Sequence, residues 1–310
     1  MYSARLHGGP VIDIKILVTG GSGLLGAGIS QLELKNHQIF FGYNNHNPEL
    51  ETYLKIDVTD NRQVDEALVR VSPDVVIHAA ALTDVDRCEK DQELAYKINV
   101  EGTKNIVNAS KKSGSSLIFV STDYVFSGDS GDYRENDETK PINYYGLSKL
   151  LAEKEVQATH GEWCIIRPSV IYGSTPAAGK VNFALWIINK LRKREQIRIV
   201  TDQWVSPTLN TNLAEMILEI AAKKQIGIFH LAGDSQVSRY DFAIEVAKIF
   251  DLEESLIQPV TMREMSWLAK RPINTSLNVG KAKRYLRVKP LEISEALSHL
   301  KREMESKTKR

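Results

Sequence analysis

Tyr145 and Lys149 stand four residues apart in a stretch with helical character, so their side chains share one face of a helix. A nearby ammonium favours the phenolate and should lower the tyrosine pKa from its ordinary value of about 10. Such a phenol can give a proton to a ketone, or take one from an alcohol, near neutral pH. Thr122 ends an apolar run upstream, and its hydroxyl could hydrogen-bond the same oxygen. The spacing alone is also typical of a solvated helix face, so its meaning depends on the surrounding elements.

Three glycines between a strand and a helix indicate a dinucleotide-binding site. Residues 15–19 are an apolar, β-branched run that predicts a buried strand, and a helical pattern follows the glycines. Glycine here allows a tight turn and close approach of the backbone to a pyrophosphate, which the helix N-terminus attracts. A plain tight turn is the alternative. The residues expected at the pyrophosphate are Gly20, Gly23, Leu24, Leu25 and Gly26.

Composition favours an ordinary globular enzyme. The 310 residues are 42% hydrophobic and 25% charged, which is enough for one large core or two smaller ones. A net charge of +1 gives no reason to expect nucleic acid or an anionic membrane as a partner. Cys88 and Cys164 fit two buried thiols better than a disulfide. No apolar stretch has the length of a membrane span, and residues 1–13 lack the apolar region of a signal peptide, so we expect a loose extension and a cytoplasmic protein.

Strands alternate with helices along most of the chain. Apolar runs predict strands at 15–19, 38–42, 55–58, 74–80, 117–122 and 163–167, and helical patterns predict helices at 61–71, 92–113 and 143–159. This order predicts an α/β fold: a Rossmann-type, doubly wound parallel sheet covered by helices on both faces. We expect residues 14–168 with about 207–235 to form this NAD(P)-binding Rossmann domain, and 226–231 to rejoin its sheet. Residues 169–206 with 236–310 should form a smaller, discontinuous substrate-binding lobe. Ligands should lie at the carboxyl ends of the strands, where the glycines, residues 79–81 and Thr122 fall.

The motifs together resemble those of a known family, the extended short-chain dehydrogenase/reductases, and within it the dTDP-4-dehydrorhamnose reductase branch. The similarity extends over about residues 14 to 290. It is carried by the glycine stretch 20–26, the run Ala79–Asp86, Asn99, the run Ser121–Gly128, the run Pro141–Lys149, Asp202-Gln203, Pro207-Thr208 and the run Arg271–Asn274. The resemblance implies an oxidoreductase that uses NADP(H) or NAD(H), with Thr122, Tyr145 and Lys149 as its catalytic residues.

Further roles follow from this resemblance. It places Asp57 at the adenine, Ala79, Ala80 and Ala81 under a ribose, and Asn99 in support of the active-site helix; Lys149 would also hold the nicotinamide ribose. From the residues themselves, Asp57 could instead end a turn or start a helix, the alanines could fill a core, and Asn99 could face solvent. The remaining cofactor contacts expected are Asn44 and Val58. The expected substrate contacts are Thr83, Tyr124, Val170, Asn182 and Arg271, of which Arg271 could bind a diphosphate with both arms of its guanidinium.

Two positions depart from the family pattern. Many bacterial members carry an aromatic residue, usually tryptophan, where this chain has Val170. Some members hold magnesium through a glutamate at the position of Gly28, so we expect no structural metal. No group of His, Cys and Asp has metal-like spacing, and His78 and His230 should be packed structural residues. The basic run 190–194 reads as a solvated helix end, with nucleotide-diphosphate attraction as the alternative.

These observations predict NAD(P)H-dependent reduction of the 4-keto group of a nucleotide sugar, dTDP-4-dehydrorhamnose giving dTDP-rhamnose. Another nucleotide-sugar reductase or epimerase of the family is one alternative. A second is a NADP-binding regulatory subunit resembling the β subunit of methionine adenosyltransferase. The stretch 42–46 after the second strand contains no acid that would repel a 2′-phosphate, so NADP(H) should bind at least as well as NAD(H). Related proteins pair two helices, here about 92–113 and 143–159, and we expect a homodimer of this kind.

Overall fold

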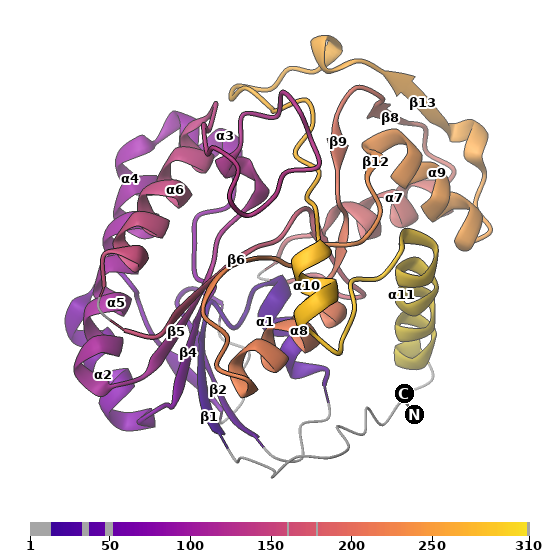
Figure 1. Cartoon of the computed structure of the whole chain (residues 1–310). Coiled ribbons are helices and arrows are strands. Elements are labelled where there is room, and N and C mark those ends of the chain that lie inside the picture. The colour runs from indigo at the N-terminus through magenta and orange to yellow at the C-terminus, as the bar shows by residue number, and fades with distance from the viewer. Residues whose placement is uncertain (1–13, 33–36, 47–51, 160, 178, 309–310) are drawn as a thin grey trace.

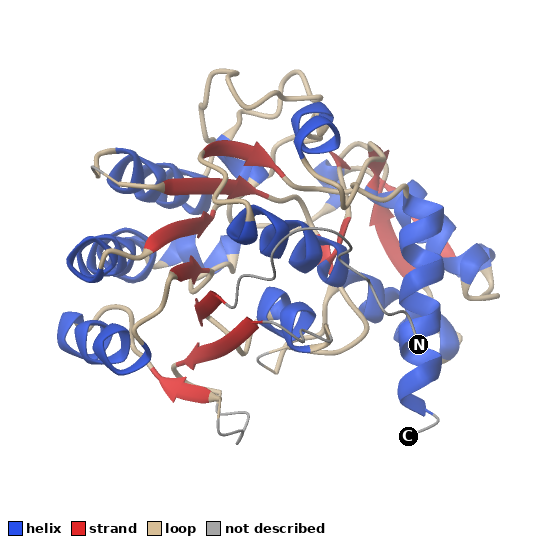
Figure 2. Ribbon diagram, turned by 60° about the horizontal axis from the view of Figure 1, so that its bottom comes forward, coloured by secondary structure: helices blue, strands red, loops and turns tan. Residues whose placement is uncertain are grey.

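The computed structural model describes residues 14–32, 37–46, 52–159, 161–177 and 179–308. A seven-stranded parallel sheet runs through the molecule in the order β11-β6-β5-β4-β1-β2-β3 (Figures 1 and 2). Its strands are β1 (Ile14–Thr19), β2 (His37–Tyr43), β3 (Tyr53–Lys55), β4 (Val75–His78), β5 (Ser116–Val120), β6 (Trp163–Arg167) and β11 (Gly227–His230). The predicted Rossmann-type fold is confirmed.

The strand order reverses beside β1. β2 and β3 extend the sheet on one side of β1, and β4, β5, β6 and β11 extend it on the other. Because β1 pairs in parallel with both β2 and β4, Thr19 lies level with Gly42 on one side and with His78 on the other. A switch point therefore opens at the carboxyl ends of β1 and β4, where such folds bind ligands. β11 pairs with β6, so the segment around 226–231 rejoins the sheet as expected.

Helices bury both faces of the sheet. One face carries α1 (Leu24–Ser30), α8 (Asn210–Ala222) and α10 (Gly280–Tyr285), and the other carries α2 (Asn61–Val71), α5 (Gly102–Ser113) and α6 (Tyr144–Gln157). Successive strand residues serve opposite cores: Ile16 and Val18 pack with the first group, and Leu17 packs with the second. This explains the near-continuous apolar strands of the sequence, since both faces exclude water.

Two predicted elements differ from the structure. The third strand, expected at 55–58, covers Tyr53–Lys55, because Asp57 accepts hydrogen bonds from the amide and hydroxyl of Thr59 and turns the chain out of the sheet. The long helix expected at 92–113 is divided into α4 (Gln92–Tyr96), a π-helical turn η1 (Lys97–Glu101) and α5. Such turns are frequent at functional sites. Here the turn carries Asn99.

The residues assigned to the lobe form short strands and several helices, and one of their strand pairs includes residues 208–209 from the range assigned to the Rossmann domain. β8 (Ile197–Val200) pairs with β13 (Ile257–Val260), β9 (Trp204–Val205) with β12 (Val237–Ser238), and β7 (Ile171–Tyr172) with β10 (Thr208–Leu209). Its core joins α7 (Phe183–Arg192), α9 (Arg239–Ile249) and α11 (Ile293–Thr308). The division into two domains stays a prediction; within it, Ala282 and Leu286 of the assigned lobe range pack in the core beneath the main sheet. None of the described helices is long and apolar enough to cross a membrane.

Candidate active site

Tyr145, Lys149 and Thr122 meet at the carboxyl end of β5. Asn143 caps α6 by accepting a hydrogen bond from the Gly146 amide at 2.9 Å, so Tyr145 lies in the first turn of the helix and Lys149 in the second. The Lys149 ammonium nitrogen donates to the Val120 carbonyl at 2.8 Å. Since Val120 is the last residue of β5, this bond joins the helix to the strand end that carries Thr122. The structure thus brings together the three residues that the sequence predicted.

Lys149 is almost completely enclosed. Its side chain is 2% exposed, and its nitrogen lies 4.1 Å from the centre of the Phe119 ring. Burial lowers the pKa of Lys149 to about 7, against the smaller opposing effect of the Glu153 charge. The amine therefore loses much of its charge at neutral pH, and its proton is held toward the carbonyl of the strand.

The pKa of Tyr145 is raised, mainly by burial, while a hydrogen bond with Thr122 acts in the opposite direction. The expected lowering of the Tyr145 pKa by Lys149 is wrong, because burial dominates and the lysine, whose own pKa is lowered, is directed to the Val120 carbonyl. A high pKa keeps the phenol protonated at neutral pH, as an acid that serves a ketone must be. The Tyr145 ring also meets the Tyr124 ring edge to face, with 5.8 Å between centres.

Asp123 holds the strand end in place, and the sequence reasoning gave it no role. Its carboxylate is 3% exposed and accepts hydrogen bonds from the hydroxyls of Thr122 (3.0 Å), Ser169 (2.8 Å) and Thr275 (2.6 Å). Thr275 belongs to the lobe range, so Asp123 ties the catalytic strand end to the lobe. A carboxylate between Thr122 and Tyr124 in an otherwise apolar run was the signal available in the sequence.

Asn99 supports α6 as expected, through side-chain bonds. Its amide accepts from the Leu82 amide at 2.7 Å and donates to the Leu82 carbonyl at 3.1 Å and to the Ser148 hydroxyl at 2.9 Å. Ser148 precedes Lys149, and Leu82 lies in the loop after β4. The π-helical turn thus links the catalytic helix to the switch point, and the alternative of a solvent-facing asparagine is excluded by its 1% exposure.

The glycine stretch has the geometry of a tight, open loop. Gly20 has φ +70°, and a Cβ there would lie 2.7 Å from the Ala80 nitrogen. A Cβ at Gly26 would lie 2.0 Å from the Gly21 carbonyl oxygen, where α1 crosses the loop. Gly23 caps α1 without any side chain over the first amides of the helix. Those amides are left for an anion, so the loop fits a dinucleotide pyrophosphate.

The other expected cofactor residues differ in what their side chains can offer. Asn44 is exposed after β2, and the alanines at 79, 80 and 81 are partly exposed at the end of β4. Asp57 accepts two hydrogen bonds from Thr59 with one carboxylate oxygen, so the turn that the sequence offered as an alternative is present. A contact with adenine stays a prediction. Leu25 and Val58 are buried in the two cores, so only their backbone could meet a cofactor. The partly exposed Leu24 begins α1.

The expected substrate residues lie on several elements in both parts of the chain. Thr83 is exposed in the loop before α3 (Val85–Lys90), and Tyr124 is buried in the short helix η2 (Asp123–Val125). Val170 has φ +30°, a rare conformation for a β-branched residue, and follows the Ser169 that bonds Asp123. Its position stays a proposed substrate contact.

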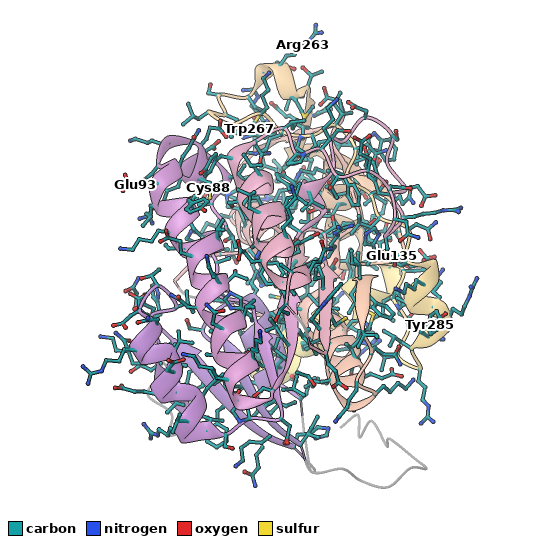
Figure 3. All side chains as sticks on the ribbon, turned by 60° about the vertical axis from the view of Figure 1, so that its left-hand side comes forward. Cys88, Glu93, Glu135, Arg263, Trp267 and Tyr285 are labelled. Carbon is teal, nitrogen blue, oxygen red and sulfur yellow. The ribbon has the colours of Figure 1, made fainter. Side chains whose placement is uncertain are left out.

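Asn182 and Arg271 are both engaged within the protein. Asn182 caps α7, accepting from the Leu185 amide and donating to the Gly173 carbonyl, so we assign it a positioning role. Arg271 forms an ion pair of 3.0 Å with Asp86 of α3, and its guanidinium lies over the Trp267 ring. Figure 3 shows Trp267 at the same end of the molecule as Cys88 of α3.

Gly28 is explained by packing. A Cβ at this position would lie 2.5 Å from the Asn210 carbonyl oxygen, so glycine allows α1 to approach α8 closely. No group of three or more His, Cys, Asp or Glu residues is placed to hold a metal ion in the described parts of the chain. That the protein needs no structural metal stays a prediction.

The histidines and cysteines predicted to be structural are buried. His78 and His230 are fully buried, and His78 lies 2.7 Å from the Thr19 hydroxyl and 3.1 Å from the Thr103 hydroxyl. Cys88 and Cys164 are buried free thiols, and burial raises the pKa of each to about 12. The basic run at the end of α7 is exposed, with Lys190 and Arg194 paired to glutamates.

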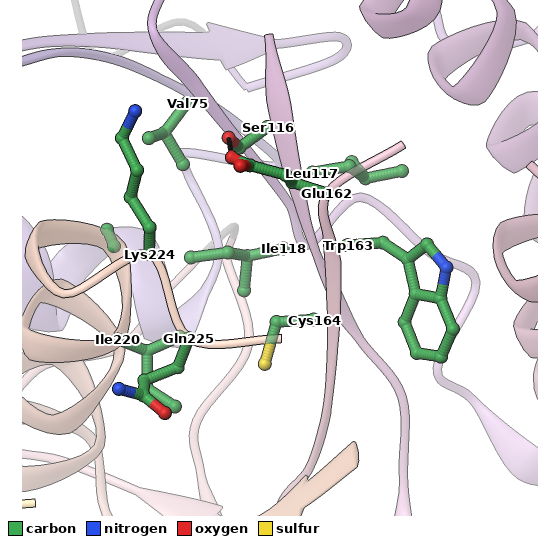
Figure 4. A pocket seen from close by; sticks show the side chains of 11 residues that line it. Val75, Ser116, Leu117, Ile118, Glu162, Trp163, Cys164, Ile220, Lys224 and Gln225 are labelled. Atoms are coloured by element: carbon green, nitrogen blue, oxygen red, sulfur yellow. Dashed lines mark hydrogen bonds between the residues drawn. The ribbon is translucent and has the colours of Figure 1, made fainter. Parts of the chain in front are cut away.

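A hollow at the opposite end of the sheet does not compete with this site. It is lined by residues at the amino ends of β4, β5 and β6, among them Val75, Ser116 and Trp163, together with Lys224 and Gln225 (Figure 4). Ser116 donates to Glu162 across it. The proposed catalytic residues lie at the opposite, carboxyl end of these parallel strands, so the hollow is remote from them.

Comparison with known proteins agrees with this geometry. The reductase Agl14 of Haloferax volcanii, described as a probable low-salt glycan biosynthesis reductase, is 33% identical over 85% of this chain and 89% of its own. Methionine adenosyltransferase 2 subunit beta of Danio rerio is 30% identical over 86% of this chain and 83% of its own. The crystal structure of dTDP-4-dehydrorhamnose reductase from Bacillus anthracis in complex with NADP superposes with a TM-score of 0.85, at 30% identity over 94% of this chain and all of that one.

The same conclusion follows from the family model described as the RmlD substrate binding domain, which matches residues 14–306. The match covers the glycine loop, the whole main sheet, the catalytic helix and nearly all of the lobe. The chain therefore belongs to the RmlD family, the family of the dTDP-4-dehydrorhamnose reductases.

Proposed function

We propose that the protein is an NAD(P)H-dependent oxidoreductase that reduces the 4-keto group of dTDP-4-dehydrorhamnose to give dTDP-rhamnose. The observation that carries the proposal is the convergence of Tyr145, Lys149 and Thr122 at one strand end, in a chain whose relatives include reductases of this substrate. A phenol that stays protonated at neutral pH, next to a buried lysine, is suited to giving a proton to a carbonyl oxygen.

The residues present fit a nicotinamide dinucleotide. The side-chain-free loop at Gly20–Gly26 would receive the pyrophosphate, and Lys149 would hold the nicotinamide ribose. When bound, the cofactor supplies the hydride for the carbonyl carbon. Tyr145 then gives its proton to the carbonyl oxygen, while Thr122 hydrogen-bonds at the phenol and is itself held by Asp123. The enclosed position of Lys149 keeps water away from the amine.

The test is turnover of dTDP-4-dehydrorhamnose with NADPH and, separately, NADH. Loss of the reduced cofactor should match the appearance of dTDP-rhamnose, identified by chromatography against a standard. UDP- and GDP-linked 4-ketosugars serve as comparison substrates. If one of them is reduced much faster than the dTDP sugar, the assigned nucleotide is wrong, although the chemistry stands.

The cofactor preference rests on the end of β2. The exposed residues there, Asn44, Asn45 and His46, include no carboxylate to repel a 2′-phosphate and no arginine to grip it. Discrimination between the two cofactors should therefore be weak, about tenfold or less in favour of NADPH. Fluorescence titration of both reduced cofactors measures the ratio, and a clear selectivity for NADH would show that the missing acid was the wrong cue.

A homodimer through α4–α5 and α6 is part of the proposal. Tyr96 and Leu147, on these two elements, are 41% and 39% exposed, which is high for large apolar side chains on a helix pair. Sedimentation at micromolar concentration should give twice the chain mass, and a monomer would contradict the prediction. The expected cytoplasmic location remains a prediction as well.

The similarity to methionine adenosyltransferase 2 subunit beta favours a second candidate, a NADP-binding regulatory subunit. In that case the cofactor would bind and the triad would be intact, but no nucleotide 4-ketosugar would be turned over. Co-purification with a methionine adenosyltransferase, together with a change in the activity of that enzyme, would support this candidate over the reductase.

A further inference from the structure

We propose that Arg239, in the lobe, binds the diphosphate of the nucleotide sugar. The inference rests on the proposed function and adds to it a residue that the sequence motifs did not indicate. Arg239 is the first residue of α9, and it follows Ser238, which caps that helix by accepting from the Asp241 amide.

The Arg239 side chain is fixed in one orientation. Its Nε donates to the side-chain oxygen of Gln203 at 2.6 Å, and Gln203 is only 2% exposed. The guanidinium lies over the Phe183 ring, 5.1 Å from its centre. The Arg239 amide also donates to the Gln203 carbonyl at 2.9 Å, so backbone and side chain are held by the same partner. Such a group meets a ligand with little further loss of side-chain freedom.

Hydrogen bonds link the fixed guanidinium to the proposed catalytic centre. Gln203, which holds Arg239, donates its side-chain amide to the Pro272 carbonyl at 3.3 Å, and Thr275, three residues further on, donates to Asp123 at 2.6 Å. Tyr124 contacts Tyr145 ring to ring, and Asp123 bonds Thr122. In the proposal, a nucleotide sugar with its keto group at Tyr145 extends past Tyr124 toward Arg239.

Arg239 keeps donors free for such a ligand. Five other arginines, at positions 62, 167, 194, 198 and 271, each lie within ion-pair distance of a glutamate or aspartate. Among the residues that the structure describes, Arg239 has no such carboxylate, and only its Nε is used in a hydrogen bond to a side chain. The two terminal nitrogens match the paired oxygens of a phosphate.

The position of this cation is not explained by helix stability. Positive charge at a helix N-terminus opposes the helix dipole, which attracts anions there instead. Asp241, in the first turn of α9, already supplies a negative charge there and accepts a hydrogen bond from the Ser238 hydroxyl. The positive charge that an anionic ligand requires would therefore come from the Arg239 guanidinium.

The experiment is calorimetric titration of dTDP, UDP and GDP into the full chain, with no sugar and no turnover. We expect Arg239→Gln to weaken the binding of the preferred diphosphate by about tenfold to a hundredfold, and Arg239→Lys to weaken it less. NADPH affinity and the melting temperature should stay as in the wild type. Arg192→Gln is the control. Arg192 is an exposed arginine at the last residue of α7, whereas the Phe183 ring beneath Arg239 belongs to the first residue of that helix.

Three results would overturn the inference. They are undiminished diphosphate binding by Arg239→Gln, an equal loss in Arg192→Gln, and a wild-type protein that binds none of the three diphosphates. If Arg239 only balances the charge of Asp123, Arg239→Gln would lower the melting temperature and leave diphosphate binding unchanged. A protein that binds dTDP through Arg239 but does not reduce the dTDP 4-ketosugar would remove the proposed substrate and leave the inference standing.

Discussion

The Rossmann part and the lobe hold their charged groups in different ways. In the Rossmann part, Arg167 at the end of β6 bonds both oxygens of Glu153 on α6, at 2.9 and 2.7 Å, with side-chain exposures of 3% and 1%. Where the lobe meets α3, Arg271 pairs with Asp86 at 3.0 Å, and the exposures are 13% and 38%. The ion pair on the helix that carries Tyr145 is removed from water, whereas the pair between Arg271 and Asp86 stays partly exposed.

The backbone shows the same difference. The proposed catalytic residues lie at the edge of a continuous seven-stranded sheet, Thr122 just after β5 and the other two on α6, while the described residues of the lobe form two-stranded sheets of two to four residues per strand. A rigid platform suits proton transfer, which needs the reacting groups in one geometry. A wall of shorter elements can follow the shape of different substrates, and loops on a fixed scaffold commonly carry specificity. We therefore expect substitutions in the two regions to have different consequences.

The largest effect on stability should come from breaking the buried pair. Arg167→Met leaves Glu153 without a partner inside the protein and should lower the free energy of unfolding by about 3–5 kcal/mol. Urea unfolding measures the change. Arg62→Met is the matched control, because its pair with Glu66 is exposed and should contribute nothing measurable. Equal effects of the two substitutions would mean that burial does not distinguish these pairs.

Removing the phenol should affect chemistry alone. Tyr145→Phe deletes one oxygen and should reduce kcat by about a hundredfold or more, with the fold and the NADPH affinity nearly unchanged. Lys149→Ala should differ by also weakening cofactor binding. Stopped-flow turnover and fluorescence titration measure the two quantities. Turnover near the wild-type rate in Tyr145→Phe would remove this residue as the acid.

Two buried histidines of the main sheet should make the stability of the protein sensitive to acid. Burial lowers the pKa of His78 and of His230 to about 3, whereas an imidazole in the unfolded chain titrates near 6.5. Between these values the unfolded chain binds more protons than the folded one, so the free energy of unfolding falls as pH decreases from 6.5 to 3. The slope is about 1.4 kcal/mol per pH unit for each histidine. Denaturant titrations at several pH values give this slope.

A substitution locates the origin of that slope. His78→Gln removes one titrating group from the sheet and should make the dependence on pH shallower. His299→Gln, at the surface of α11, should leave it unchanged. A slope that is the same in all three proteins would assign the acid sensitivity to other groups.

The smallest effect is expected at the open ion pair. Arg271→Gln should cost no more than about 1 kcal/mol of stability, because Asp86 is left where water can reach it. The loss should appear in KM for the nucleotide sugar, about fivefold, with kcat nearly constant. A large drop in melting temperature with unchanged KM would show that Arg271 has a structural task like that of Arg167.

Much of the Rossmann part was predictable because its signals are local. The strand at 163–167 and the helix at 61–71 have the predicted bounds, and apolar runs bounded by turn residues located the rest within a few positions. The spacing of Tyr145 and Lys149 and the spacing of the glycines between a strand and a helix could also be recognised in the sequence. The π-helical turn at 97–101 could not, since it interrupts a helical pattern without a breaker residue and is tied by Asn99 to Leu82 and Ser148.

The sequence by itself indicated which residues are candidates for the chemistry: a tyrosine and a lysine one helical turn apart, a threonine at a strand end, and glycines between a strand and a helix. Only the tertiary structure decided their state. Burial raises the pKa of Tyr145 and lowers that of Lys149. Tertiary contacts also commit Asn182 to a helix cap, and among the described residues they leave Arg239 without an ion-paired carboxylate. Spacing along the chain specifies which side chains can share a helix face or a strand end. Their charge and their free hydrogen-bond donors depend on desolvation and on distant partners, which exist only in the folded protein.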